Sequence, residues 1–227
     1  MQRLRIRYAK RGRARFTSGR DFGRAFERAL RRAGVPMAYS SGFSPHPRIS
    51  YANAAPTGAA SEAEFLEIGL ARRCDPARVR EALDAALPEG LDVVEVVEAE
   101  GPALADRLTG SEWSIELDGV AEATLDRAVE ELWRRPALVV ERMTKSGLRS
   151  FDVRGALVAL SRDGTTLTVV LEHQTPLVRA DDVLTALRAL APAGSLPTAG
   201  RLTRRRQGRL GEGGEIADPL TLPPQST

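Results

Sequence analysis

Arginine is the residue whose number and spacing point most directly to chemistry in this chain. Residues 1–32 hold 12 basic and 2 acidic side chains, whereas the other 195 residues hold 21 basic and 28 acidic ones. A second basic run, from Arg201 to Arg209, contains five arginines and no acid. Guanidinium groups match the geometry of phosphate oxygens, and neutralising several phosphates is the usual source of affinity for nucleic acid. These two segments therefore predict a phosphate-facing surface with RNA as its ligand.

The candidate phosphate-binding residues belong to three consecutive segments. Apolar and basic residues alternate from Arg3 to Tyr8, which predicts a strand with arginines on one face and Leu4, Ile6 and Tyr8 on the other. We expect the arginines of this strand to be exposed, or else paired with acids of the second half, because burying unpaired guanidinium groups is too costly. A turn and an arginine-rich helix follow. The candidate set is Arg3, Arg5, Arg7, Arg11, Arg13, Arg15, Arg20, Arg24 and Arg28.

A second candidate site is the loop that contains Gly42-Phe43-Ser44-Pro45-His46-Pro47. The two prolines fix the backbone on either side of the histidine and forbid a helix there. A catalytic histidine needs a carboxylate to orient it, and Glu62 and Glu64 are the nearest in sequence, although the sequence alone determines no pairing. The alternative is a rigid binding loop. Its candidate residues are Tyr39, Ser40, Gly42, Phe43, His46 and Arg48.

Several other kinds of site are disfavoured by composition. The chain has one cysteine, Cys74, and two histidines far apart in sequence, so we expect no metal site and no cofactor. The glycines lack the spacing of a Walker or dinucleotide-binding loop. No apolar run approaches the roughly 20 residues of a membrane span, and no signal peptide is evident. We therefore expect a cytoplasmic protein without membrane contact.

The elements that would position these residues recur twice along the chain. Residues 18–33 carry an apolar stripe at helical spacing, and Asp75-Pro76 opens a second helix. With the strands around them, they give the order β-α-β-β-α-β, and a similar order follows residue 112, with strands expected at 138–142, 153–160 and 167–171. This predicts an α+β fold of two tandem ferredoxin-like halves with antiparallel sheets. The expected divisions are 1–100, 110–210 and a disordered tail at 211–227.

The residues also resemble a known family. Phe16-Thr17-Ser18 with Asp21, the stretch from Tyr39 to Pro47, and Glu141-Arg142-Met143-Thr144-Lys145-Ser146-Gly147 are similar to the radical-SAM-linked family of bacterial proteins. This resemblance implies a separately encoded radical SAM protein as partner and a link to RNA metabolism. The family usually has Ser-His before the helix Asp, whereas Gly19 follows Ser18 here. The chain also lacks the Cys-x₃-Cys-x₂-Cys motif of the radical SAM cluster itself.

Three functional hypotheses follow. The first is an RNA-binding or accessory protein of RNA metabolism that uses the arginine-rich surface. The second is an enzyme that acts on RNA through His46 and its loop. The third is an adaptor that binds a radical SAM protein. A steep salt dependence of RNA binding would distinguish the first from the third.

Overall fold

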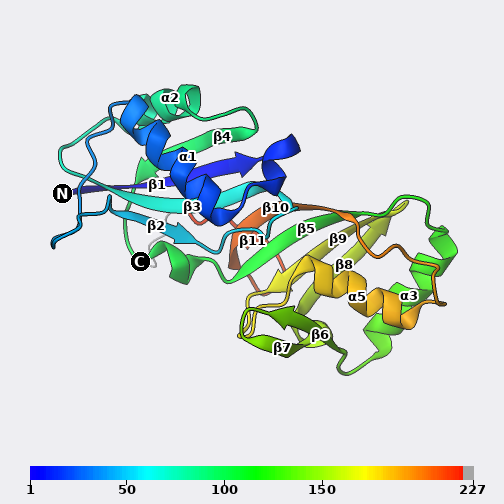
Figure 1. Ribbon diagram of the computed structural model, residues 1–227. Coiled ribbons are helices and arrows are strands. Elements are labelled where there is room, and N and C mark those ends of the chain that lie inside the picture. The colour runs from blue at the N-terminus through cyan, green and yellow to red at the C-terminus, as the bar shows by residue number, and fades with distance from the viewer. Residues whose placement is uncertain (222–227) are drawn as a thin grey trace. The chain divides into compact units, whose positions relative to one another are not determined.

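The computed structural model describes residues 1–221, which form a mixed α+β fold with antiparallel strand pairing. The chain divides into two compact units (Figure 1). Met1–Leu108 and residues 218–221 make the first unit, and Thr109–Ala217 make the second.

In the first unit, four strands pair in the order β4-β1-β3-β2, every pair antiparallel. The elements are β1 (Gln2–Lys10), η1 (Gly12–Phe16), α1 (Gly19–Arg32), β2 (Ile49–Ala52), β3 (Ala60–Leu70), α2 (Pro76–Ala86), β4 (Leu91–Glu98) and η2 (Leu104–Arg107). The first strand is thus central, between β4 and β3, as the predicted topology requires.

Helices α1 and α2 cover one face of this sheet (Figure 1). Leu4, Ile6 and Tyr8 of β1 pack in one buried cluster with Phe26 and Leu30 of α1. The predicted helix starts are confirmed. Ser18 Oγ accepts a hydrogen bond from the Asp21 backbone N–H at 3.2 Å, and Asp75 caps α2 in the same way.

The opposite face of the sheet is covered by the first unit's own chain. Leu104, Leu108 and Leu220 pack against Phe65 of β3 in a second buried cluster. We expected this face to be open or covered by the other half. The segment from Glu100 to Leu108 and residues 219–221 instead cover this face, which alternation within the strands does not reveal.

The second unit repeats the same pairing order with an inserted hairpin. Its main strands are β5 (Gly110–Glu116), β8 (Leu157–Asp163), β9 (Thr166–Glu172) and β10 (Arg201–Leu210), paired in the order β10-β5-β9-β8. Its long helices are α3 (Glu122–Arg134) and α5 (Ala180–Leu190). Leu125 and Leu132 of α3 and Val183 and Leu187 of α5 are buried.

Two details of the second unit correct the sequence prediction. The strand expected at 138–142 is β6 (Val139–Thr144), which pairs with β7 (Gly147–Asp152) as a separate two-stranded sheet. The strand expected at 153–160 begins only at Leu157, because Val153–Ala156 form one turn of helix, α4. The disordered tail expected from residue 211 is also wrong for the described residues, since β11 (Ile216–Ala217) pairs with β10. Residues 222–227 of that predicted tail lie outside the described part.

Candidate nucleic-acid interface

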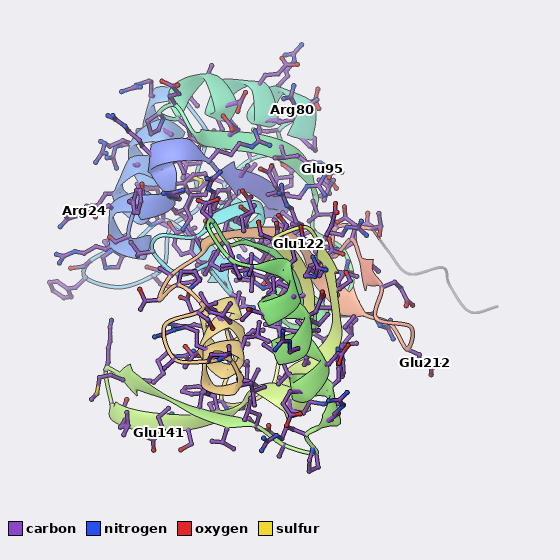
Figure 2. All side chains as sticks on the ribbon, turned by 90° about the vertical axis from the view of Figure 1, so that its right-hand side faces the viewer. Arg24, Arg80, Glu95, Glu122, Glu141 and Glu212 are labelled. Carbon is purple, nitrogen blue, oxygen red and sulfur yellow. The ribbon has the colours of Figure 1, made fainter. Side chains whose placement is uncertain are left out.

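The outer face of α1 carries a row of exposed arginines. Its apolar residues are drawn to the core, so Arg20, Arg24, Arg28 and Arg31, spaced by four, four and three residues, share the opposite side. Figure 2 labels Arg24 at the outer edge of this helix. Within residues 1–221, no carboxylate forms an ion pair with any of the four.

The two acids of α1 do not neutralise this row. Asp21 is engaged at the helix start, where its carboxylate accepts a 2.7 Å hydrogen bond from Ser18 Oγ. Glu27 is half-buried and lies close enough to Tyr51 to influence its ionisation. The helix therefore holds five arginines against two acids.

The short helix η1 extends the positive charge ahead of α1. Arg13 is exposed, and no ion pair engages it in the described part of the chain. Arg15 places its guanidinium 4.6 Å from the centre of the Phe16 ring, a cation–π contact. Of the Arg15 guanidinium nitrogens, only Nε is buried without a hydrogen-bond partner.

Arg5 of β1 is not part of an exposed surface. It is 1% exposed, its Nε donates to Glu67 at 3.2 Å, and its Nη1 donates to the Glu100 carbonyl at 2.8 Å. Its Nη2 donates to the Pro102 carbonyl. The expectation of exposure, or of pairing with the second half, is wrong for Arg5, because Glu67 and the cover segment belong to the first unit.

The remaining candidates near β1 are also engaged by carboxylates. Arg3 pairs with Glu67 at 3.0 Å. Arg7 pairs with Glu95 at 3.0 Å and with Asp218 at 2.9 Å.

Arg11, at the turn after β1, hydrogen-bonds Glu62 and also Asp92, the latter at 2.7 Å. The hydrogen bond to Glu62 is the main reason why the Arg11 pKa lies above its ordinary value. Four of the nine predicted phosphate-binding arginines, Arg3, Arg5, Arg7 and Arg11, therefore bridge the strands of the first unit.

The predicted binding loop closes on itself. Ser40 donates its backbone N–H to the His46 carbonyl at 2.9 Å, and its Oγ accepts from the His46 N–H at 3.1 Å. Arg48 Nε donates to the Tyr39 carbonyl at 3.3 Å. Gly42 has φ +126°, and Phe43 beside it is fully exposed. The loop is thus held by its own hydrogen bonds and exposes the aromatic ring of Phe43.

His46 receives no orienting carboxylate from the described residues. Its side chain is exposed, and only its backbone groups are hydrogen-bonded. Glu62 is paired with Arg11, and Glu64 accepts a hydrogen bond from the Ala55 N–H at 3.1 Å. The geometry therefore does not supply the arrangement that general acid–base chemistry at His46 would need.

A hollow of about 420 Å³ brings the loop together with β1. Ser40 and Arg48 line it from the loop, and Arg3 and Glu67 line it from the sheet. From the sequence, the loop and the β1 arginines are predicted as two separate sites. Since Arg3 is already paired with Glu67, the hollow offers Arg48 as its remaining cation.

The basic run of β10 is partly neutralised inside the second unit. Arg201 pairs with Glu116 at 3.2 Å, and Arg206 approaches Glu112 at 3.6 Å. Arg204 is buried and hydrogen-bonds Gln207 at 3.0 Å.

Two general features of the described residues can be stated. Residues 1–221 contain no group of three or more histidine, cysteine, aspartate or glutamate side chains that could hold a metal ion. None of the helices in this range combines the length and the apolar character that crossing a membrane requires.

Sequence comparison adds a family to this geometry. Residues 3–180 match the model of a family described as uncharacterized proteins conserved in bacteria, DUF2344. The chain belongs to this family. That description names neither an activity nor a radical SAM partner, so the genetic link expected from the sequence stays a prediction. No curated protein matches the chain.

A comparison of folds gives a distant likeness for this DUF2344 chain. It is similar to a chain of a solved Cbf5-Nop10-Gar1 complex, at 12% identity and a TM-score of 0.48. The match covers 90% of this chain and 48% of the other, so the DUF2344 chain spans about half the length of the solved chain.

Sequence reasoning missed two features of the interface. Phe16 and Tyr51 are exposed aromatic residues on the elements beside the arginine row of the DUF2344 chain. Phe16 directly follows Arg15, which is a usable signal. Tyr51 is a strand residue whose position against α1 depends on tertiary packing, and no sequence spacing reveals it.

Proposed function

We propose that this protein binds RNA through the arginines of η1 and α1, which are Arg13, Arg15, Arg20, Arg24, Arg28 and Arg31. The observation that carries the proposal is the row on α1, where exposed arginines lie one helical turn apart with no carboxylate paired to them in the described residues. Like charges at this spacing destabilise a helix, and an anionic ligand would relieve that repulsion by binding along the row.

Ion pairing elsewhere in the first unit supports the restriction of the interface to the arginines of η1 and α1. Arg3, Arg5, Arg7 and Arg11 have carboxylate partners, and binding phosphate would require those pairs to open. Arg20, Arg24 and Arg28 need no such exchange. The proposed interface therefore keeps the helix and η1 arginines of the predicted set and assigns the β1 arginines to stability.

The experiment is a titration of structured RNA at several salt concentrations with two matched variants. Arg20, Arg24 and Arg28 changed together to Gln remove three charges from α1. Arg127, Arg134 and Arg135 changed together to Gln remove three charges at and just beyond α3. We expect the α1 variant to bind more weakly, with a salt slope shallower by up to about 3, since each phosphate contact contributes nearly one unit.

The α3 variant is expected to bind RNA like the wild type. Equal weakening by both variants would show that net charge alone determines binding. Absence of RNA binding by the wild type at low salt would overturn the proposal.

A second candidate function is that of an adaptor for a separately encoded radical SAM protein, which the family resemblance implies. The observation that favours a protein partner is the outer face of the β6–β7 hairpin, where Val139, Met143 and Leu148 are exposed. Met143 and Leu148 lie directly opposite each other. Co-purification with the partner, lost on changing both residues to Ser while folding is kept, would test this role.

The enzymatic alternative rests on His46 alone. Loss of turnover in His46→Ala with RNA binding retained is the result that would establish it.

We also propose that the two units are tandem ferredoxin-like halves. The support is the shared antiparallel order, β4-β1-β3-β2 in one and β10-β5-β9-β8 in the other. An experimental structure whose units do not superpose on that order would contradict this.

A further inference from the structure

Exposed aromatic residues are concentrated in one part of the described chain. Among residues 1–221, the aromatic side chains classed as exposed are Phe16, Tyr39, Phe43 and Tyr51, all in the first unit. The aromatic residues of the second unit, Trp113, Trp133 and Phe151, are buried or half-buried. The four exposed rings lie within residues 16–51, and the arginine row of α1 lies in the same segment.

Tyr51 lies against α1 at the buried residue Phe22 and at Gly23, between the core side of the helix and its outer face. Its ring meets the Phe22 ring edge to face, with centroids 5.9 Å apart. Its hydroxyl lies 3.4 Å from the point where a Cβ would stand on Gly23, the residue next to Arg24. The ring is still 44% exposed. Tyr51 is therefore anchored at one edge and open to solvent beside the row.

The Tyr51 hydroxyl keeps its proton at neutral pH. Burial of the hydroxyl, with a further contribution from Glu27, raises the pKa of Tyr51 to about 12. The ring therefore carries no negative charge of its own, and the nearby carboxylate is that of Glu27.

Phe16 lies at the end of η1, ahead of the N-terminal end of the row. It precedes the α1 cap residue Ser18 by two positions, and Arg20 follows it by four. Its ring is 59% exposed, with the Arg15 guanidinium against it. Nothing in the core requires an aromatic ring here, because η1 contributes no buried residue.

We propose that the RNA bound by this protein is single-stranded, with its bases stacked on Phe16 and Tyr51 and its phosphates held by Arg20, Arg24 and Arg28. This inference rests on the proposed function and specifies its ligand. Proteins that bind single strands combine a basic track with aromatic rings on which bases stack. Bases in a duplex have both faces covered by their neighbours, so exposed rings beside a basic helix favour unpaired nucleotides.

The test compares three fluorescent ligands of about 12 nucleotides, a length within the usual range of site sizes: an unstructured RNA, the same RNA in a duplex, and the matching single-stranded DNA. The principal variant changes Phe16 and Tyr51 together to Leu, which keeps an apolar contact with Phe22. Phe16→Tyr with Tyr51→Phe keeps both rings. Leu148→Ala removes a side chain of similar exposure, 57%, from the second unit.

We expect the double Leu variant to bind single-stranded RNA about 5- to 100-fold more weakly for each ring lost. Its salt slope should stay near that of the wild type, because no phosphate contact is removed. Binding to the duplex should change little, and the variants that keep the rings or change Leu148 should bind like the wild type. Phe16→Leu alone, at a position without core contacts, provides the same test if the double variant folds poorly.

The results separate this inference from the proposed function. Equal binding of duplex and single strand, or full affinity in the double Leu variant, overturns the stacking inference, while the α1 arginine variant still tests RNA binding. Tighter binding of the DNA than of the RNA overturns the assignment of RNA as the ligand. No binding of any of the three overturns both proposals.

Discussion

Helices α1 and α3 occupy the same place in the strand order of their units but differ in the charges on their outer faces. Each follows the central first strand, and each buries an apolar stripe, with Leu30 in α1 and Leu132 in α3. The α1 segment holds five arginines and two acids, whereas the α3 segment holds two arginines and four acids. The fold therefore constrains the buried stripe and leaves the outer face free to vary.

All charged residues of α3 except Arg127 form ion pairs within its own unit. Arg134 pairs with Glu130 at 3.3 Å, one turn earlier on the helix. Glu122, labelled in Figure 2, and Asp126 receive Arg162 from β8, at 2.9 and 2.6 Å. The arginine row of α1 has no such partners among the described residues. This difference, rather than arginine content, distinguishes a face that serves stability from one that is available to a ligand.

The largest expected effect concerns the buried apolar stripe that the two helices share. Leu30→Asp and Leu132→Asp should each abolish the cooperative folding of its unit, because an unpaired buried carboxylate costs several kcal/mol out of the ~5–15 that a domain has. Both leucines are at most 2% exposed. Thermal melting followed by circular dichroism measures the loss. A variant that melts like the wild type would show that its stripe is not core.

The next effect separates paired from unpaired arginines. Arg5→Gln should destabilise the first unit by about 2–3 kcal/mol, because it removes three hydrogen bonds from a buried side chain and leaves the Pro102 carbonyl without its donor, while Glu67 keeps Arg3 and the Glu100 carbonyl keeps Arg107. Arg24→Gln, on the exposed row, should change stability by no more than about 0.5 kcal/mol. Urea denaturation gives both values. Similar losses in the two variants would mean that Arg24 has a partner inside the protein.

The contrast between Arg5 and Arg24 also shows how far sequence reasoning reaches. Helical and strand periodicity locates α1, α2 and β1 and identifies their buried sides, because local spacing fixes which residues share a face. It does not reveal that Glu100 to Leu108 folds over β1, since that depends on contacts far apart in sequence. Strand alternation alone therefore predicts a solvent-exposed Arg5, whereas the tertiary structure buries this side chain.

The second unit shows a related limit. The repeated strand order is visible in the sequence, but the β6–β7 hairpin interrupts it. Val153–Ala156, predicted as the start of a strand, forms a helical turn, with Val153 and Ala156 buried. The candidate interface is predictable only in part for the same reason. The arginine row on α1 follows from helical spacing, whereas the position of Tyr51 against α1 does not.

A smaller effect concerns a glycine that α1 contains and α3 lacks. Gly23→Ala should stabilise the first unit by about 0.5–1 kcal/mol, because glycine in a helix interior is less favourable than alanine by that amount. The new Cβ would meet the Tyr51 hydroxyl at 3.4 Å, an ordinary contact distance. Equilibrium denaturation measures the gain. A loss of stability would show that Tyr51 packs more tightly on α1 than this distance indicates.

The smallest effect compares single arginines at the two outer faces and has opposite signs. Arg28 has Arg24, Arg31 and Arg32 as its neighbours three or four residues away, so Arg28→Gln removes only repulsions. Arg134 has Glu130 and Glu131 at the same spacings, so Arg134→Gln removes only attractions.

Each such pair is worth about 0.2–0.5 kcal/mol, and glutamine resembles arginine in helix propensity. We expect Arg28→Gln to raise stability slightly and Arg134→Gln to lower it slightly. Denaturation at low and at high salt tests this, since screening should shrink both differences. Destabilisation by Arg28→Gln that persists at high salt would show that Arg28 supports the fold through packing. In that case the row on α1 would no longer differ from α3 in the way that the proposed RNA interface requires.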